Sequence, residues 1–221
     1  GVEGPCRPGT SRDLGAPRGC RLQESSSPMR SLVPTLATVA ALAGPAVADT
    51  TADRGALLAL NGTYHSASVE PWYGGYGTRE FVFADGQLSL TFIHALDPGM
   101  TQRTFQFRTG GAYAVQDPSD AVSGAFHSVF DEDWKHLTLL TPVPEIAAAM
   151  GMADCGLTVN LEADISETGC AAWRPVADCG QDHDLLALSS EGLHFGQRPA
   201  DNDMCTADRT PTALLTAVVA R

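Results

Sequence analysis

Residues 78–92 most constrain the fold, because apolar and polar residues alternate on both sides of a central Asp-Gly pair. Asp-Gly is a favoured two-residue turn of β-hairpins. The register that this turn sets pairs Phe83 with Leu88 and Phe81 with Leu90, which puts four large apolar side chains on one face. The opposite face is mostly polar. The segment therefore predicts an antiparallel hairpin that turns one face toward a core.

Similar alternating segments follow along the chain, separated by short stretches rich in Gly or Asp. The segments that we expect to be strands are 103–108, 112–116, 125–130, 134–140, the hairpin 185–197 and 213–220. We expect turns at Gly110-Gly111 and at residues 131–133, and a short helix at residues 145–150. Strands at this spacing predict an all-β fold. We expect an antiparallel meander that forms a lipocalin-like barrel or half-barrel, with one short helix and two disulfides.

Residues 29–48 are typical of a secretory signal, with a positive start at an internal methionine, a mostly apolar run and an Ala-Val-Ala cleavage site. Residues 1–28 lack apolar periodicity, and we interpret them as translated upstream sequence. The apolar run is shorter than the roughly 20 residues that span a membrane. We therefore expect cleavage near Ala48 and export to a periplasm or outside the cell. The mature chain, residues 49–221, is expected to be a single β-barrel-like domain without an integral membrane segment.

Four cysteines remain in residues 49–221, and in an exported chain they are expected to form disulfides. They are Cys155, Cys170, Cys179 and Cys205. Their spacings lack the C-x-x-C pairs that are common in zinc sites, so we expect no metal.

The last predicted hairpin favours one disulfide pairing of the three that four cysteines allow. With Glu191-Gly192 as its turn, Leu188 lies opposite Phe195. This register, continued away from the turn, brings Cys179 next to Cys205. The pairing Cys179–Cys205 leaves Cys155 to Cys170.

Charge and motifs exclude several classes of function. Residues 49–221 hold 23 acidic and nine basic residues, a formal charge of −14. Such a chain repels phosphate backbones, so we expect no nucleic-acid partner. The sequence contains no G-x-S-x-G, H-E-x-x-H or P-loop motif, and we expect no catalysis and no cofactor. An enzyme built on an acidic pair would need two carboxylates with perturbed pKa values in one pocket.

Aromatic residues recur on one face of consecutive predicted strands. They pack in an ordinary core, or they line a barrel interior with room for an apolar ligand. The candidate ligand-binding residues on this face are Phe81, Phe83, Leu90, Phe92, Phe105, Phe107 and Tyr113. A Gly-rich aromatic loop adds the candidates Trp72, Tyr73 and Tyr76. This loop either caps the mouth of a barrel or is a plain connection.

A series of short motifs between residues 62 and 212 resembles, in its order, the domain of the adenomatosis polyposis coli down-regulated proteins. The motifs are Gly62-Thr63-Tyr64, Arg79-Glu80-Phe81-Val82-Phe83, Asp97-Pro98, Thr168-Gly169-Cys170, Leu193-His194-Phe195-Gly196, Arg198-Pro199 and Arg209-Thr210-Pro211-Thr212. The chain departs from that family in having Tyr64 in place of Trp and no cysteine in its first strands. The resemblance implies an extracellular lipocalin-like barrel that binds a lipid or a lipidated protein without catalysis.

These observations lead to one functional expectation and one alternative. The expectation is an exported, non-enzymatic protein that binds an apolar ligand, such as a lipid or acyl chain, in its barrel. The alternative is an interaction or inhibitor module of the cell envelope that uses the loop at residues 72–77 and the region near Asp203 without a small ligand.

Overall fold

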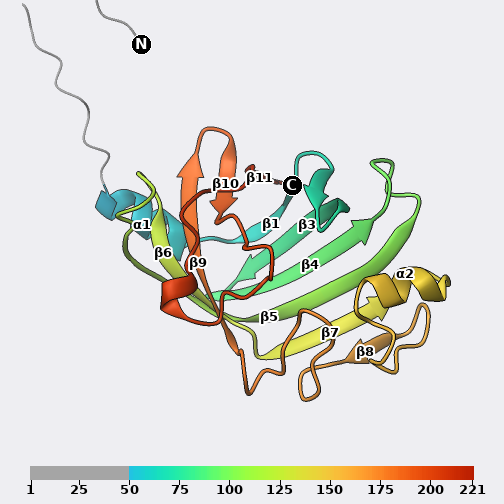
Figure 1. Cartoon of the computed structure of the whole chain (residues 1–221). Helices are drawn as coiled ribbons and strands as arrows, with labels where there is room; N and C mark the ends of the chain where they lie inside the picture. Colours follow the sequence, from blue (N-terminus) through green and yellow to red (C-terminus); the bar gives the residue numbers. More distant parts are fainter. Residues whose placement is uncertain (1–49) are drawn as a thin grey trace, which may run out of the picture. The chain divides into compact units, whose positions relative to one another are not determined.

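A computed structural model gives the structure of the chain and describes residues 50–221 (Figure 1). The expected signal and the upstream segment, residues 1–48, lie outside the described residues. The elements in chain order are α1 (Thr50–Leu58), β1 (Gly62–Ser66), β2 (Glu70–Trp72), β3 (Gly75–Ala84), β4 (Gln87–Ala95), β5 (Arg103–Pro118), β6 (Phe126–Asp131), β7 (Trp134–Leu139), α2 (Pro144–Ala149), β8 (Glu162–Asp164), β9 (Gln181–Ser189), β10 (Gly192–Phe195), the 3₁₀ turn η1 (Ala207–Arg209) and β11 (Val218–Ala220). No helix in this part of the chain has the length and apolar character needed to cross a membrane.

Eight antiparallel strands close a β-barrel. The ring runs β1, β3, β4, β5, β6, β9, β10 and β11, and β11 pairs with β1 to close it. Neighbours in the ring also follow one another in the chain once β2, β7 and β8 are set aside, so the barrel is an up-and-down meander. The predicted all-β antiparallel fold is confirmed. It has two short helices, whereas we expected one, because residues 50–58 form α1 in addition to α2.

The Asp-Gly hairpin has the predicted register. Phe83 pairs with Leu88 and Phe81 pairs with Leu90 across β3 and β4. Asp85 and Gly86, the two turn residues, both have positive φ, as a type I′ turn requires. The predicted apolar face points into the barrel, since three of these four side chains are under 10% exposed and the fourth packs against them.

Strand β5 belongs to two parts of the molecule. One edge pairs with β4, while the other edge pairs with β6 near the C-terminal end of β5 and with β7 near its N-terminal end. Strand β7 then pairs with β8, and α2 lies beside these strands (Figure 1). The barrel therefore carries a side extension made of half of β5 together with β7, β8 and α2.

The two predicted turns around β5 are wrong. Gly110 and Gly111 lie inside one continuous strand, and β6 and β7 are both antiparallel to β5, so residues 131–133 do not reverse the chain. A side chain at Gly110 would press on the backbone of β4 and the ring of Trp134, and one at Gly111 would overlap the carbonyl of Asp131. These glycines allow neighbouring backbones to approach closely where the sheet divides, and they do not form a turn.

The last hairpin is shifted by two residues from the predicted register. Leu188 pairs with Leu193, and Ser189 pairs with Gly192, so the turn residues are Ser190 and Glu191. Gly192 has a φ of 135° and lies against the carbonyl of Val218 in β11, which explains why glycine stands there. A shift of two keeps the same face inward. The closing strand is also shorter than the predicted 213–220.

Both predicted disulfides are present: Cys155 is bonded to Cys170 and Cys179 to Cys205. The first lies beside the core of the extension. The second ties the start of β9 to the loop before η1. Disulfides of this kind stabilise a folded chain by roughly 2–4 kcal/mol each, mainly by restricting the unfolded state.

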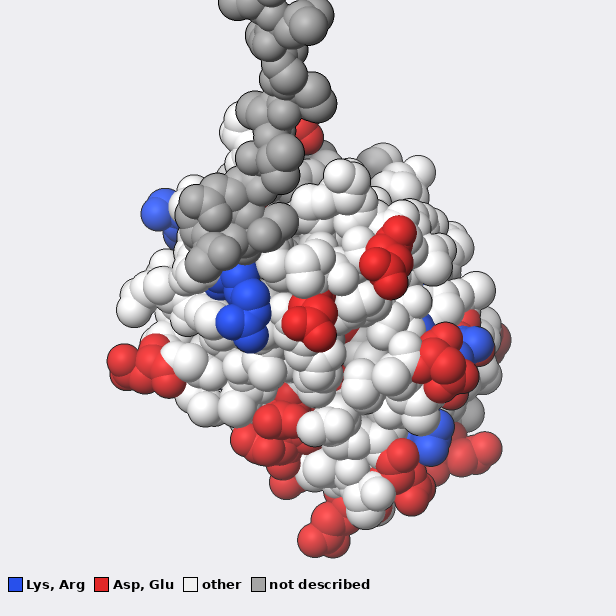
Figure 2. All heavy atoms as spheres, turned by 90° about the vertical axis from the view of Figure 1, so that its left-hand side faces the viewer, with Lys and Arg blue, Asp and Glu red and all other residues white. Residues whose placement is uncertain are grey.

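Helix α1 covers one end of the barrel. Leu57 is fully buried in the barrel core, and Arg54 donates hydrogen bonds to the carbonyls of Val115 and Gln116 at the end of β5. The face at this side of the molecule carries scattered acidic side chains and few basic ones (Figure 2). The other end of the barrel is where β5 passes into the extension.

The need for glycine at position 111 can be tested by making the same substitution, Gly to Ala, at two positions. We expect Gly111→Ala to lower the free energy of unfolding by about 1–3 kcal/mol, because the new methyl group meets backbone that has no room to move. Gly55→Ala is the matched control: this site is exposed in α1 with nothing within 4 Å, and we expect a gain of roughly 0.5–1 kcal/mol. Urea unfolding of the three proteins measures both. Equal changes in the free energy of unfolding of the two variants would contradict the role that we give to Gly111.

Candidate functional site

An apolar cavity of about 70 Å³ lies where the barrel and the extension divide. Its lining comes from both apolar clusters of the molecule, with Phe81 and Phe195 from the barrel core and Phe92 and Phe107 from the extension core. Leu90 of β4 packs against both clusters and also lines the cavity. The cavity is therefore a product of the divided sheet.

Stacked and edge-on aromatic rings form part of the cavity wall. Phe81 stacks on Phe195 with 3.9 Å between ring centroids, and Phe107 stacks on Trp173 at 4.7 Å. In each pair, one ring comes from a barrel strand and the other from a segment distant in sequence. Such ring pairs contribute about 0.5–1.5 kcal/mol beyond the area that they bury.

Six of the ten predicted ligand-binding residues line this cavity, and the structure brings them together from four strands and a turn. They are Trp72, Tyr73, Phe81, Leu90, Phe92 and Phe107.

The other four predicted residues lie elsewhere. Phe83 and Tyr113 pack within the barrel core, and the hydroxyl of Tyr113 donates to the carbonyl of Leu57. Phe105 belongs to the extension core, stacked on His94. Tyr76 occupies the opposite parity on β3 from Phe81, so it lies on the outer face.

A second, polar hollow of about 260 Å³ adjoins the cavity. We call it the mouth, because it lies directly beside the cavity and five residues line both spaces. These residues are Glu132, Trp173, Asp182, Arg198 and Asn202. A ligand with an apolar end in the cavity would place its other end among these polar groups.

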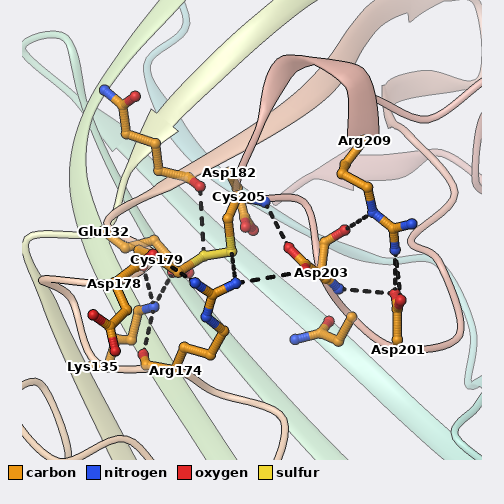
Figure 3. The surroundings of a disulfide bond; sticks show 12 residues. Glu132, Lys135, Arg174, Asp178, Cys179, Asp182, Asp201, Asp203, Cys205 and Arg209 are labelled. Carbon is orange, nitrogen blue, oxygen red and sulfur yellow. Dashed lines mark hydrogen bonds and ion pairs between the residues drawn. A yellow bond between two sulfur atoms is a disulfide. The ribbon is translucent and has the colours of Figure 1, made fainter.

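Two buried ion pairs stand at the boundary of cavity and mouth. Arg198 Nη1 is 2.7 Å from Asp182 Oδ2, and Lys135 Nζ is 2.7 Å from Glu132 Oε2. Lys135 also donates to the carbonyl of Cys179, so the ammonium holds the backbone at the disulfide (Figure 3). Removing one partner of such a pair would leave an uncompensated buried charge, which destabilises strongly.

A contact across the cavity joins the turn between β2 and β3 to the C-terminal loop. The hydroxyl of Tyr73 donates to Asn202 Oδ1 at 2.7 Å, and Arg198 Nε donates to the same oxygen at 2.7 Å. All three residues line the cavity. This contact is part of the wall that a ligand would pass.

The charged residues of the site were missed by sequence reasoning, although the alternation pattern contained a signal for two of them. Arg79 has the same parity on β3 as Phe81 and Phe83, and Asp184 has the same parity on β9 as Leu186. A charged residue at an inward position is rarely buried without a partner. Such positions in the pattern therefore indicate a polar site inside the barrel.

Two carboxyl groups that line the cavity have raised pKa values. Burial raises the pKa of Glu132 from 4.5 to about 7, with a further increase from the charge of Asp182 and an opposing effect of Lys135. Burial also raises the pKa of Asp184 from 3.8 to about 7, against the opposing charge of Arg198. Both groups therefore gain protons in the folded state near neutral pH.

No family model matches the chain, and a search of curated proteins finds no match. Within residues 50–221, no group of three or more His, Cys, Asp or Glu side chains is placed to hold a metal ion.

The raised pKa values predict a pH dependence of stability. Between about pH 5 and 7 the folded chain holds more protons at these two sites than the unfolded chain, so the free energy of unfolding falls as the pH rises. Asp184→Asn removes one of the two groups and keeps an oxygen for the N–H groups of Leu185 and Gly196. We expect the slope to become shallower by up to about 1.4 kcal/mol per pH unit.

Urea unfolding at several pH values measures this slope. Asp120→Asn, at an exposed position, is the control and should leave the slope unchanged. An unaltered slope in Asp184→Asn would contradict the assignment.

Proposed function

We propose that the protein is an exported, non-enzymatic binding protein that takes an apolar ligand, such as the end of a lipid or acyl chain, into its barrel. One observation carries the proposal: the apolar cavity of about 70 Å³ where the barrel and the extension divide, which lies next to the polar mouth. Ligand sites of this type combine an apolar lining with a few placed polar groups. The two disulfides suit an oxidising compartment, which supports export.

The size of the cavity limits what can enter it. A buried water needs about 10–15 Å³ of cavity volume, so the cavity has room for only a few heavy atoms. A longer chain would extend into the mouth, which is larger and polar. The proposed ligand is therefore amphipathic, with a short apolar end inside. A lipocalin-like barrel related to the adenomatosis polyposis coli down-regulated proteins belongs to the same proposal.

Native mass spectrometry of residues 49–221, exported to an oxidising periplasm, tests the proposal. We expect extra mass that is lost on denaturation and that is identified as lipid. Leu90→Trp fills the cavity from β4 and should abolish the extra mass. Val82→Trp, on the outer face of β3, should retain it. Protein of bare mass in the wild type would contradict the proposal and favour the envelope interaction module.

A second candidate, a hydrolase that uses an acidic pair, is favoured by one observation. Glu132 and Asp184 both line the cavity and both have a pKa raised to about 7. Against it, each carboxylate is occupied: Asp184 Oδ1 accepts two backbone N–H bonds, and Glu132 is paired with Lys135. A general acid or base must reach the proton that it transfers.

Turnover of chromogenic esters and glycosides separates the two candidates. We expect no turnover above the uncatalysed rate by the wild type. Hydrolysis that is lost in Asp184→Asn, while that variant remains folded by circular dichroism, would establish the hydrolase and contradict the proposed binding protein.

A further inference from the structure

Arg79 is a buried arginine with one unused donor group. Its side chain is 4% exposed, and Nε and Nη2 donate to the two carboxylate oxygens of Glu70 at 2.9 and 2.7 Å. Nη2 also donates to the carbonyl of Thr216 at 2.8 Å. Nη1 is buried and has no partner among residues 50–221. An unpaired buried donor costs about 1–3 kcal/mol, so it calls for an explanation.

The guanidinium group of Arg79 lies beside the cavity. Arg79 lines the cavity, and its guanidinium carbon lies 5.7 Å from the ring of Trp72 and 5.9 Å from the ring of Phe81, two further lining residues. The guanidinium is planar, so its fixed geometry turns Nη1 away from the edge that binds Glu70. The surrounding aromatic wall offers this N–H group no oxygen. A ligand oxygen in the cavity would satisfy it.

The charge of the site decides which oxygen fits. Glu70 already neutralises Arg79 through a two-bond ion pair. The cavity lining also contains the acidic residues Asp131, Glu132, Asp182 and Asp184, and besides Arg79 it contains one basic residue, Arg198. Even with Glu132 and Asp184 partly protonated near pH 7 and Lys135 paired with Glu132, an anionic headgroup would meet a small net negative charge. A neutral acceptor gains the hydrogen bond without that repulsion.

We infer that the cavity takes a neutral ligand whose carbonyl or hydroxyl oxygen accepts a hydrogen bond from Nη1 of Arg79. This inference rests on the proposed function and narrows the ligand to esters, ketones, amides and alcohols in place of free fatty acids. The specificity for a polar atom of the ligand then comes from the buried Nη1 donor of Arg79. The aromatic rings of the cavity contact the apolar part of the ligand.

Calorimetric titration with three six-carbon probes tests the inference: hexane, butyl methyl ketone and hexanoate. We expect the wild type to bind the ketone roughly ten- to a hundred-fold more tightly than hexane, because a hydrogen bond to a charged group is gained. Hexanoate should bind more weakly than the ketone. The double variant Glu70→Gln/Arg79→Met removes the donor and the charge of its partner together, so no unpaired charge is left. We expect this variant to lose the preference for the ketone over hexane.

The matched control makes the same two changes on the outer side of β3. Glu80→Gln/Arg221→Met removes an exposed pair with 3.7 Å between its charged atoms and should keep the preference. Equal affinity of the wild type for ketone and hexane, a preference that survives in the Arg79 variant, or tightest binding of hexanoate would each overturn the inference and leave the binding function standing. Binding of none of the three probes would overturn both.

Discussion

The structure depends on one long strand that pairs with different partners along one edge. One edge of β5 pairs with β4 along residues 103–112. The other edge pairs with β7 up to Gly110 and with β6 from Tyr113 onward. Without side chains at these positions, the backbones of β4 and of residue 131 can approach closely enough for both pairings to form. The barrel can then close while the extension folds beside it. The cavity lies at this division, so the same constraint that shapes the sheet also creates the candidate site.

The alternation of apolar and polar residues predicted well which face of a strand is buried. The side-chain period of a strand is two, so a register error of two residues does not change the face. The hairpin of β9 and β10 illustrates this: its register was wrong by two, yet Leu186 still points inward and the expected disulfides are present. The β3–β4 hairpin was correct in detail, since its Asp-Gly turn fixes the register locally.

The remaining errors arise from contacts between distant segments. Gly110 and Gly192 resemble turn residues in the sequence, but each is glycine because a distant backbone lies against it. The buried charges depend on partners that only the fold supplies, such as Asp182 for Arg198 and Glu70 for Arg79. The sequence of a single strand does not show which distant residue pairs with a buried charge. The aromatic part of the site was therefore predictable. For the polar part, the alternation pattern indicated the inward positions of Arg79 and Asp184 but not the partners of the buried charges.

The cavity is the proposed binding site for the apolar part of a small neutral ligand, and the position of a bound ligand can be observed directly. The most direct measurement is a methyl NMR titration with methyl hexanoate. We expect the methyl groups of Leu88 and Leu90, which line the cavity, to shift with one saturating affinity, while the exposed Leu161 and Leu188 remain unchanged. Shifts confined to the exposed leucines, or no shifts at all, would contradict the account.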